Sequence, residues 1–150
     1  MELYNRVTAG FEDRLTLGLH VCRGNWSKRE DVMISGDYQP LVECFQGMHA
    51  RQLVLEYCTP RAGELAVIGR ALADREIGLG CVNPRTDEAE SPESIVARAT
   101  EAREYWEPSK ILLNPDCGFA CFANRGVNVE QVAGAKLRSM AEAARRLRGG

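Results

Sequence analysis

The sequence has no long apolar run and no excess of charge of one sign. No hydrophobic stretch approaches the roughly 20 residues that a membrane-spanning helix needs. The N-terminal segment, MELYNRVTAGFEDR, is amphipathic and lacks the apolar core of a signal peptide. The 19 basic and 21 acidic residues give a net charge of −2, which provides no basic surface for nucleic acid. We therefore expect a cytoplasmic protein that binds neither membrane nor nucleic acid.

The composition is typical of a globular domain, with 45% hydrophobic and 27% charged residues. The sequence contains no internal repeat, low-complexity segment or linker, so residues 1–150 are expected to form one domain. In a reducing cytoplasm, cysteines serve as core residues, metal ligands or nucleophiles rather than as a disulfide framework. The six cysteines are Cys22, Cys44, Cys58, Cys81, Cys117 and Cys121.

Short apolar runs alternate with longer amphipathic segments along the chain. The runs predict strands at residues 15–22, 52–58, 76–83 and 110–117. The segments between and after them predict helices at residues 38–49, 62–74, 92–107 and about 128–147. This order predicts a parallel sheet with right-handed crossovers. Four βα units of this kind make an incomplete TIM barrel, which is half of a (β/α)₈ barrel.

Two of the predicted helices begin with recognisable capping patterns. Ser91 precedes Pro92 and is a suitable N-cap for the third of these helices. Asn128, with Gln131 three residues later, resembles a capping box at the start of the last helix.

Four potential metal ligands lie at the ends of predicted strands. His20 and Cys22 are two residues apart at the end of the first strand, so their side chains share one face. Glu56 and Cys117 lie at the ends of the second and fourth strands. Active sites of α/β barrels are built at this carboxyl end. Zn²⁺ accepts imidazole, carboxylate and thiolate ligands, although a chance set of strand-end residues remains an alternative interpretation.

Two other cysteines are rival ligands. Cys58 lies two residues after Glu56 and faces the same way, and Cys121 lies four residues after Cys117 in a loop. Either thiol could replace one of the proposed ligands.

Polar residues beside these positions are candidates for supporting roles. Arg23, Asn25 and Asp116 flank the ligands and could orient them or bind substrate, and Asp116 could accept a hydrogen bond behind a ligand. Arg23 could equally stabilise its own loop. Arg85 follows the third strand and is a candidate contact for an anionic group of the substrate.

The motifs GLHVCRGN, LVLEY and LNPDCGF occur in this order along the chain. Together they resemble the C-terminal, zinc-binding half of the catalytic barrel of cobalamin-independent methionine synthases, and in particular the short-form branch of that family. The resemblance runs from about residue 5 to residue 147. It implies that His20, Cys22, Glu56 and Cys117 are the zinc ligands.

The resemblance also implies a reaction. The zinc ion would activate the thiol of homocysteine, which would accept a methyl group from a polyglutamylated methyltetrahydrofolate to form methionine. Two alternatives remain open. One is a related zinc thiol alkyltransferase with another acceptor or donor, such as coenzyme M or a methylated corrinoid protein. The other is a truncated, non-catalytic zinc-binding half-barrel.

Half a barrel leaves two sheet edges unpaired, which natural proteins avoid. We therefore expect that the chain self-associates, that a partner subunit completes the barrel, or that the chain is a fragment.

Overall fold

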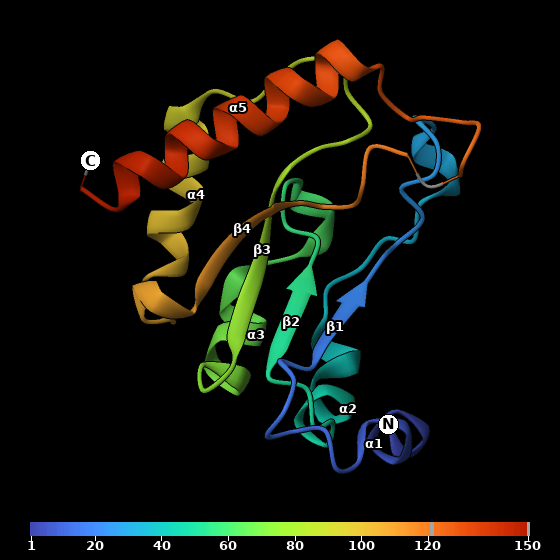
Figure 1. The fold of residues 1–150 in the computed structure, drawn as a ribbon, viewed down its shortest axis with the longest axis vertical. Coiled ribbons are helices and arrows are strands. Elements are labelled where there is room, and N and C mark those ends of the chain that lie inside the picture. Colours follow the sequence, from blue (N-terminus) through green and yellow to red (C-terminus); the bar gives the residue numbers. More distant parts are fainter. Residues whose placement is uncertain (121, 150) are drawn as a thin grey trace.

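The computed structural model describes residues 1–120 and 122–149. In these ranges strands and helices alternate after a short N-terminal helix (Figure 1). The elements are α1 (Glu2–Thr8), β1 (Gly18–Val21), α2 (Val42–Gln46), β2 (Gln52–Leu55), α3 (Leu65–Leu72), β3 (Glu76–Val82), α4 (Pro92–Ala102), β4 (Ile111–Pro115) and α5 (Glu130–Leu147). None of the described helices is long and apolar enough to cross a membrane.

The four strands form one parallel sheet in the order β1-β2-β3-β4. The predicted parallel sheet and its alternation with helices are therefore confirmed. Each strand pairs with the next one in the sequence, as in a TIM barrel, so the chain is a partial barrel with β1 and β4 at its two edges (Figure 1).

The strands are shorter than the apolar runs predicted. β2 ends at Leu55 because the next backbone N–H groups bond to side chains instead of to a neighbouring strand. The N–H of Glu56 donates to the Tyr38 hydroxyl and the N–H of Tyr57 donates to Asp116 Oδ1, both at 2.9 Å.

The segment before β1 is also not a strand. The N–H of Leu15 donates to the carbonyl of Phe11 at 2.9 Å, so the start of the first predicted strand is a turn. The helix predicted at 38–49 is a 3₁₀ turn followed by the short α2.

The two predicted helix caps have different outcomes. The Ser91 side chain accepts a hydrogen bond from the N–H of Ser94 at 3.1 Å, which confirms it as the N-cap of α4. The capping box at Asn128 is wrong, because α5 begins at Glu130 after Val129 and has no side-chain cap. The Asn128 amide instead donates to the carbonyl of Thr86 at 2.8 Å, which ties the approach to α5 to the loop after β3.

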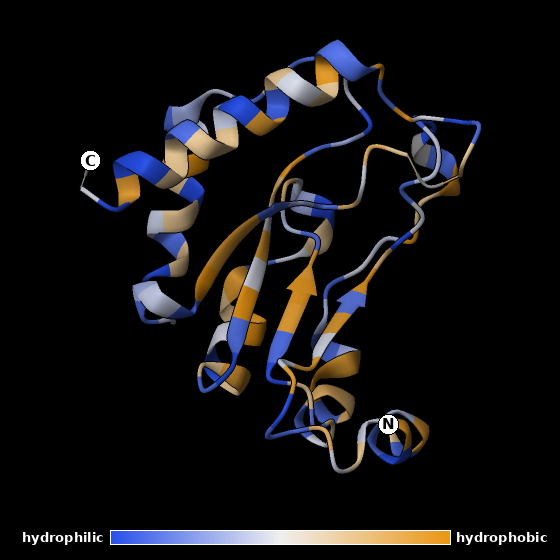
Figure 2. Ribbon diagram, viewed as in Figure 1, coloured by the Kyte–Doolittle hydropathy of each residue, from blue (hydrophilic) through white to orange (hydrophobic). Residues whose placement is uncertain are grey.

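The helices cover one face of the sheet. Side chains on that face, such as Leu53, Leu55 and Leu79, are at most 1% exposed and pack against α2, α3 and α4. Apolar residues are concentrated in β2 and α3, whereas α5 has alternating polar and apolar stripes (Figure 2). The opposite face, which would line a barrel interior, is more open: His20 is exposed and Leu112 is 41% exposed.

Glycines on β3 allow neighbouring strands to place side chains across this inner face. A Cβ atom on Gly78 would lie 2.8 Å from both Asn114 Oδ1 and Val54 Cγ2. A Cβ atom on Gly80 would lie 2.6 Å from the Leu55 carbonyl and would overlap the Asp116 carboxylate. The inner face is therefore crowded at β3, as expected for a barrel interior.

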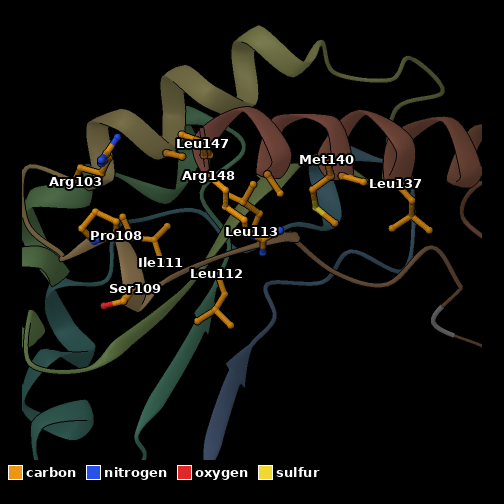
Figure 3. Close-up of a pocket in the computed structure, with 13 residues that line it drawn as sticks. Arg103, Pro108, Ser109, Ile111, Leu112, Leu113, Leu137, Met140, Leu147 and Arg148 are labelled. Atoms are coloured by element: carbon orange, nitrogen blue, oxygen red, sulfur yellow. The ribbon is translucent and has the colours of Figure 1, made fainter. Parts of the chain in front are cut away.

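A large apolar groove of about 690 Å³ lies beside the open edge of the sheet, between β4, α4 and α5 (Figure 3). Its lining includes Leu112, Leu137, Met140 and Leu147. None of the candidate metal ligands lines it. The groove therefore belongs to the unpaired edge of the sheet and not to the polar site at the strand ends.

Candidate metal site at the carboxyl ends of the strands

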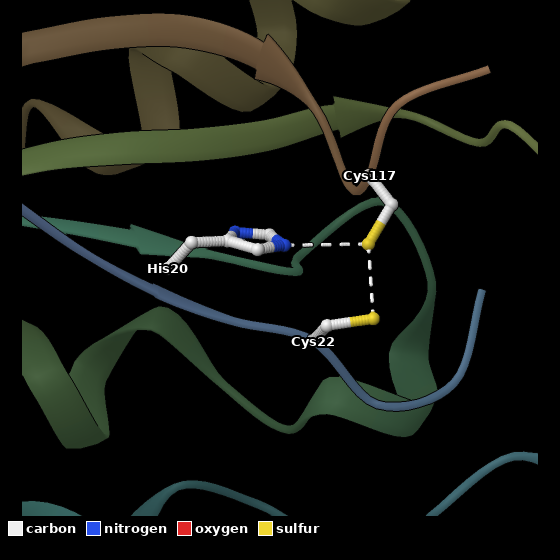
Figure 4. A group of neighbouring side chains, drawn as sticks. All are labelled: His20, Cys22 and Cys117. Carbon is white, nitrogen blue, oxygen red and sulfur yellow. Dashed lines mark hydrogen bonds between the residues drawn. The ribbon is translucent and has the colours of Figure 1, made fainter. Parts of the chain in front are cut away.

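His20, Cys22 and Cys117 lie together at the carboxyl ends of β1 and β4 (Figure 4). Their ligand atoms are all within 4.8 Å of one another. The Cys117 sulfur lies 3.3 Å from His20 Nε2 and 3.1 Å from the Cys22 sulfur. Cys22 and Cys117, which are 95 positions apart in the sequence, thus meet because the carboxyl ends of parallel strands lie at the same end of the sheet.

The imidazole of His20 is oriented by the backbone. Its Nδ1 lies 3.1 Å from the carbonyl oxygen of Val54, which can only accept a hydrogen bond. A proton on Nδ1 leaves the lone pair of Nε2 directed toward the two thiols. Metal-binding histidines usually have this arrangement, with one ring nitrogen donating to a carbonyl or carboxylate.

Glu56 lies directly after β2, and its side chain is 1% exposed. Its Oε1 is 3.8 Å from the Cys117 sulfur. Glu56 therefore borders the cluster through Cys117, although it is not among the three residues whose ligand atoms all lie within 4.8 Å. Oε1 accepts hydrogen bonds from the N–H of Arg23 at 2.7 Å and from the Asn25 amide at 2.5 Å. Among the described residues, Oε2 has no hydrogen-bond donor, although the Arg61 guanidinium lies 3.9 Å from it as an ion pair.

The environment of Cys117 disfavours a bare thiolate. Burial, and then the neighbouring thiol of Cys22, raise the pKa of Cys117 above its usual range, while a hydrogen bond with Asn25 opposes that rise. A cation between the two sulfurs would instead lower the pKa of the thiols, because it stabilises their deprotonated forms. With a buried carboxylate oxygen that lacks a donor and an imidazole whose Nε2 faces the thiols, these residues fit a zinc ion chemically.

The Arg23 side chain points away from the cluster. Its guanidinium stacks 4.1 Å from the centre of the Tyr38 ring and donates to the backbone carbonyls of Gly36 and Arg61. Of its two expected roles, the side chain therefore has the contacts of a loop-stabilising residue, whereas its backbone N–H holds Glu56.

Asn25 is fully buried and lies between two charged side chains. Its Nδ2 donates to Glu56 Oε1 at 2.5 Å, and its Oδ1 accepts a hydrogen bond from Arg85 Nε at 3.0 Å. Arg85 is 4% exposed. Asn25 thus contacts the candidate ligand Glu56, and Arg85 contacts Asn25 inside the protein instead of lying on an open surface.

Asp116 is also buried, and burial raises its pKa to about 6. Its carboxylate accepts hydrogen bonds from the N–H groups of Tyr57 and Cys58 and, at 2.6 Å, from the Cys58 thiol. Cys58 therefore has Asp116 as its partner, and no described contact joins its sulfur to the three-residue cluster. The other rival ligand, Cys121, lies outside the described residues.

Sequence reasoning missed Tyr38, whose hydroxyl holds both backbone groups of Glu56. The hydroxyl accepts from the Glu56 N–H at 2.9 Å and donates to its carbonyl at 3.3 Å. Burial raises the pKa of Tyr38 to about 12, so the phenol stays protonated. No spacing pattern relates Tyr38 to Glu56, because the contact depends on how the loop after β1 folds back over β2.

Together, the fold and the site define a partial α/β barrel with an imidazole, two thiols and a carboxylate at the carboxyl ends of its strands. The family model described as "Cobalamin-independent synthase, Catalytic domain" matches residues 10–146. The chain therefore belongs to the cobalamin-independent methionine synthase family.

Several relatives have similar sequences. The uncharacterized protein YxjH of Bacillus subtilis is 33% identical over 144 residues, a match that covers 93% of this chain and 37% of YxjH. The methionine synthase of Pyrococcus abyssi is 28% identical over 148 residues, covering 99% of this chain and 38% of the relative. The methionine synthase of Thermococcus kodakarensis is 29% identical over 125 residues, a match that covers 83% of this chain and 33% of the relative.

A solved structure confirms the fold. The B12-independent methionine synthase from Shewanella sp. W3-18-1, in complex with selenomethionine, matches with a TM-score of 0.81 and 16% sequence identity. The match covers 97% of this chain and 41% of the Shewanella chain. The chain thus spans less than half the length of the relatives it matches.

Proposed function

We propose that this chain forms the zinc-binding half of a methionine synthase barrel, with His20, Cys22, Glu56 and Cys117 as the ligands. The observation that carries the proposal is the convergence of an imidazole and two thiols within 4.8 Å, at the end of the sheet where barrel enzymes act. When bound, zinc would supply Lewis acidity that lowers the pKa of a substrate thiol.

The residues of this chain would prepare that site. Val54 fixes the ring of His20 through its carbonyl, and Tyr38 fixes the backbone of Glu56. His20 and Cys22 are exposed on the inner face, so a small thiol can reach their side of the cluster from solvent. Cys117 and Glu56 are both buried, so solvent does not reach the cluster from their side.

Membership of the family supports the chemistry. Methionine synthases make methionine, so we propose homocysteine as the thiol and methyltetrahydrofolate, in its polyglutamylated form, as the methyl donor. A cytoplasmic location accords with this proposal, because a reducing compartment keeps thiol ligands available. The five cysteines in the described part of the chain are all free thiols.

Turnover would require four further βα units, either in the same polypeptide or in another one. β1 and β4 both have an unpaired edge, and the apolar groove beside β4 includes Leu112 and Leu137, which are 41% and 47% exposed. A further strand and helix at this edge would bury these side chains and complete a closed sheet, which removes unpaired edges. The relatives also have more than twice the length of this chain.

The direct test of the ligands is the zinc content of the purified chain against that of Cys117→Ser. The proposal requires about one zinc per chain in the wild type and a large loss in the variant. Equal zinc in both proteins contradicts the ligand assignment. Cys44→Ser is a suitable control, because Cys44 lies in α2, away from the strand ends.

The acceptor can be tested on the same protein after Co²⁺ replaces zinc. Addition of homocysteine should strengthen the thiolate-to-cobalt absorption, since a further sulfur joins the metal. A response to coenzyme M but not to homocysteine favours the related alkyltransferase instead.

The short span of the match also supports a second candidate, a zinc-binding half-barrel without turnover. Joining the chain to the N-terminal part of the Pyrococcus abyssi relative separates the two candidates. Methionine formation by the chimera supports the enzyme, whereas normal zinc content without turnover supports the module.

A further inference from the structure

The Arg85 guanidinium and the Glu56 carboxylate are connected by one buried amide. Arg85 lies in the loop after β3, Asn25 in the loop after β1, and Glu56 directly after β2. Two hydrogen bonds, of 3.0 Å and 2.5 Å, link the three side chains in that order. The three residues are at most 4% exposed, so water competes little for these hydrogen bonds.

Arg85 and Glu56 favour the same orientation of the Asn25 amide, with its oxygen toward Arg85 and its NH₂ group toward Glu56. An arginine side chain can donate hydrogen bonds but cannot accept them. Arg85 Nε therefore requires the oxygen of Asn25 on its own side, which turns the NH₂ group toward the carboxylate. With the amide reversed, two acceptors, Asn25 Oδ1 and Glu56 Oε1, would face each other at 2.5 Å, which is repulsive.

The amide in turn fixes the rotation of the carboxylate. Oε1 receives two donors, the Asn25 NH₂ and the backbone N–H of Arg23. These donors hold Oε1 at 3.8 Å from the Cys117 sulfur. Without the amide, Oε1 would keep the N–H of Arg23 and the long contact to the Cys117 sulfur, and the Arg61 guanidinium would stay 3.9 Å from Oε2. The Glu56 side chain would then be held less tightly about its last torsion.

We infer that Arg85 is a positioning residue for the metal site, acting through Asn25 to hold the Glu56 carboxylate beside Cys117. The inference rests on the proposed function, because it takes Glu56 as a zinc ligand. It replaces the expectation that Arg85 meets an anionic part of the substrate, since its Nε is directed to Asn25 inside the protein.

The test is a double-mutant cycle on metal binding by the purified chain, with Arg85→Met, Asn25→Ala and the double variant. Zinc affinity is measured by competition with a chromophoric chelator, and ligand geometry by the absorption spectrum of the Co²⁺ form. Each single change should weaken zinc binding about tenfold or more, the range seen when residues that orient metal ligands are removed. Each should also shift the cobalt bands. The double variant should bind no more weakly than Asn25→Ala alone, because Arg85 acts through Asn25.

Arg75→Met is the matched control. Its guanidinium also holds a loop, donating to the carbonyls of Met48 and Ala50, but it lies at the opposite end of the sheet. This variant should lose stability without a change in zinc affinity or in the cobalt spectrum. If Arg85→Met does not fold, Arg85→Leu, which also lacks a donor for Asn25 Oδ1, is measured with the same expectations.

Two results overturn the inference. One is a wild-type zinc affinity and cobalt spectrum in Arg85→Met. The other is full additivity of the two single changes, which would mean that Arg85 acts independently of Asn25. Both differ from failure of the proposed function, in which the wild type itself binds no zinc or Cys117→Ser binds as much zinc as the wild type.

Discussion

Asp116 holds Cys58 at two points, accepting a hydrogen bond from its backbone N–H at 3.1 Å and from its thiol at 2.6 Å. The same carboxylate accepts the N–H of Tyr57 at 2.9 Å. These bonds join the end of β4 to the segment that follows β2, although β3 lies between the two strands. Gly80 makes the crossing possible, since any Cβ on it would overlap the Asp116 carboxylate.

Asp116→Ala is therefore expected to destabilise the fold. The substitution leaves the buried N–H of Tyr57 and the half-buried N–H of Cys58 without their acceptor, and an unsatisfied buried group costs about 1–3 kcal/mol. We expect a loss of about 3 kcal/mol in the free energy of unfolding, measured by urea denaturation. Asp13→Ala, at an exposed position, should change it by less than about 0.5 kcal/mol. Equal stability of the two variants would contradict the structural role of Asp116.

Gly80→Ala should also be strongly destabilising. The new methyl group would meet the Leu55 carbonyl at 2.6 Å and the Asp116 carboxylate, so the strand pairing or the carboxylate must move. Overpacking of this kind typically costs about 1–3 kcal/mol. Gly118→Ala is the control, because a Cβ atom there would meet nothing within 4 Å. Comparable melting temperatures for the two variants would show that β3 tolerates a side chain at residue 80.

The buried lysine of α5 leads to a third prediction. Lys136 has no exposed surface, and its Nζ lies 3.2 Å from Glu90 Oε2 and 3.3 Å from Thr86 Oγ1. Lys136→Met would leave the Glu90 carboxylate without its cation, and breaking a buried pair in this way costs about 3–5 kcal/mol. Because the Glu90 side chain is 21% exposed, solvent should reduce the loss to the lower end of that range.

A second substitution tests whether the lost pair is the cause. Adding Glu90→Gln to Lys136→Met removes the unpaired charge, so part of the stability should return in urea denaturation. A double variant that is less stable than Lys136→Met would mean that Glu90 matters mainly for another contact, such as the hydrogen bond from the N–H of Asn83 to its Oε1 at 2.8 Å.

Zinc itself should stabilise the fold. A ligand that binds only the folded state raises its stability by an amount that grows with ligand concentration over Kd. At about 100 times Kd the gain is roughly 2.7 kcal/mol, so we expect a rise of several degrees in the melting temperature of the wild type. A chelator should reverse the rise.

Cys22→Ser is the informative comparison for the zinc effect. Cys22 is exposed, so this substitution should leave the metal-free stability almost unchanged while it removes one proposed ligand. Its melting temperature should respond little to zinc. The same zinc-induced rise in both proteins would place the stabilising ion elsewhere on the chain.

Much of the fold could be predicted from the sequence because it depends on local patterns. Alternating apolar runs and amphipathic segments indicated four parallel strands in consecutive order, and Ser91 was recognisable as a helix cap. The limits of the elements were harder to predict. The N–H groups of Glu56 and Tyr57 bond to Tyr38 and Asp116, so β2 ends earlier than its apolar run. Asn128 bonds to Thr86 instead of capping α5.

The sequence by itself determined which side chains stand at the carboxyl ends of the strands, since all strands of a parallel sheet have their carboxyl ends on the same side. This is why His20, Cys22 and Cys117 could be grouped in advance; their binding of zinc remains a prediction. Only the tertiary structure decided how loops from three strands enclose Glu56. Arg85 reaches Asn25 across 60 residues of sequence, and such a contact leaves no periodic signal because it depends on how the loops fold over one another.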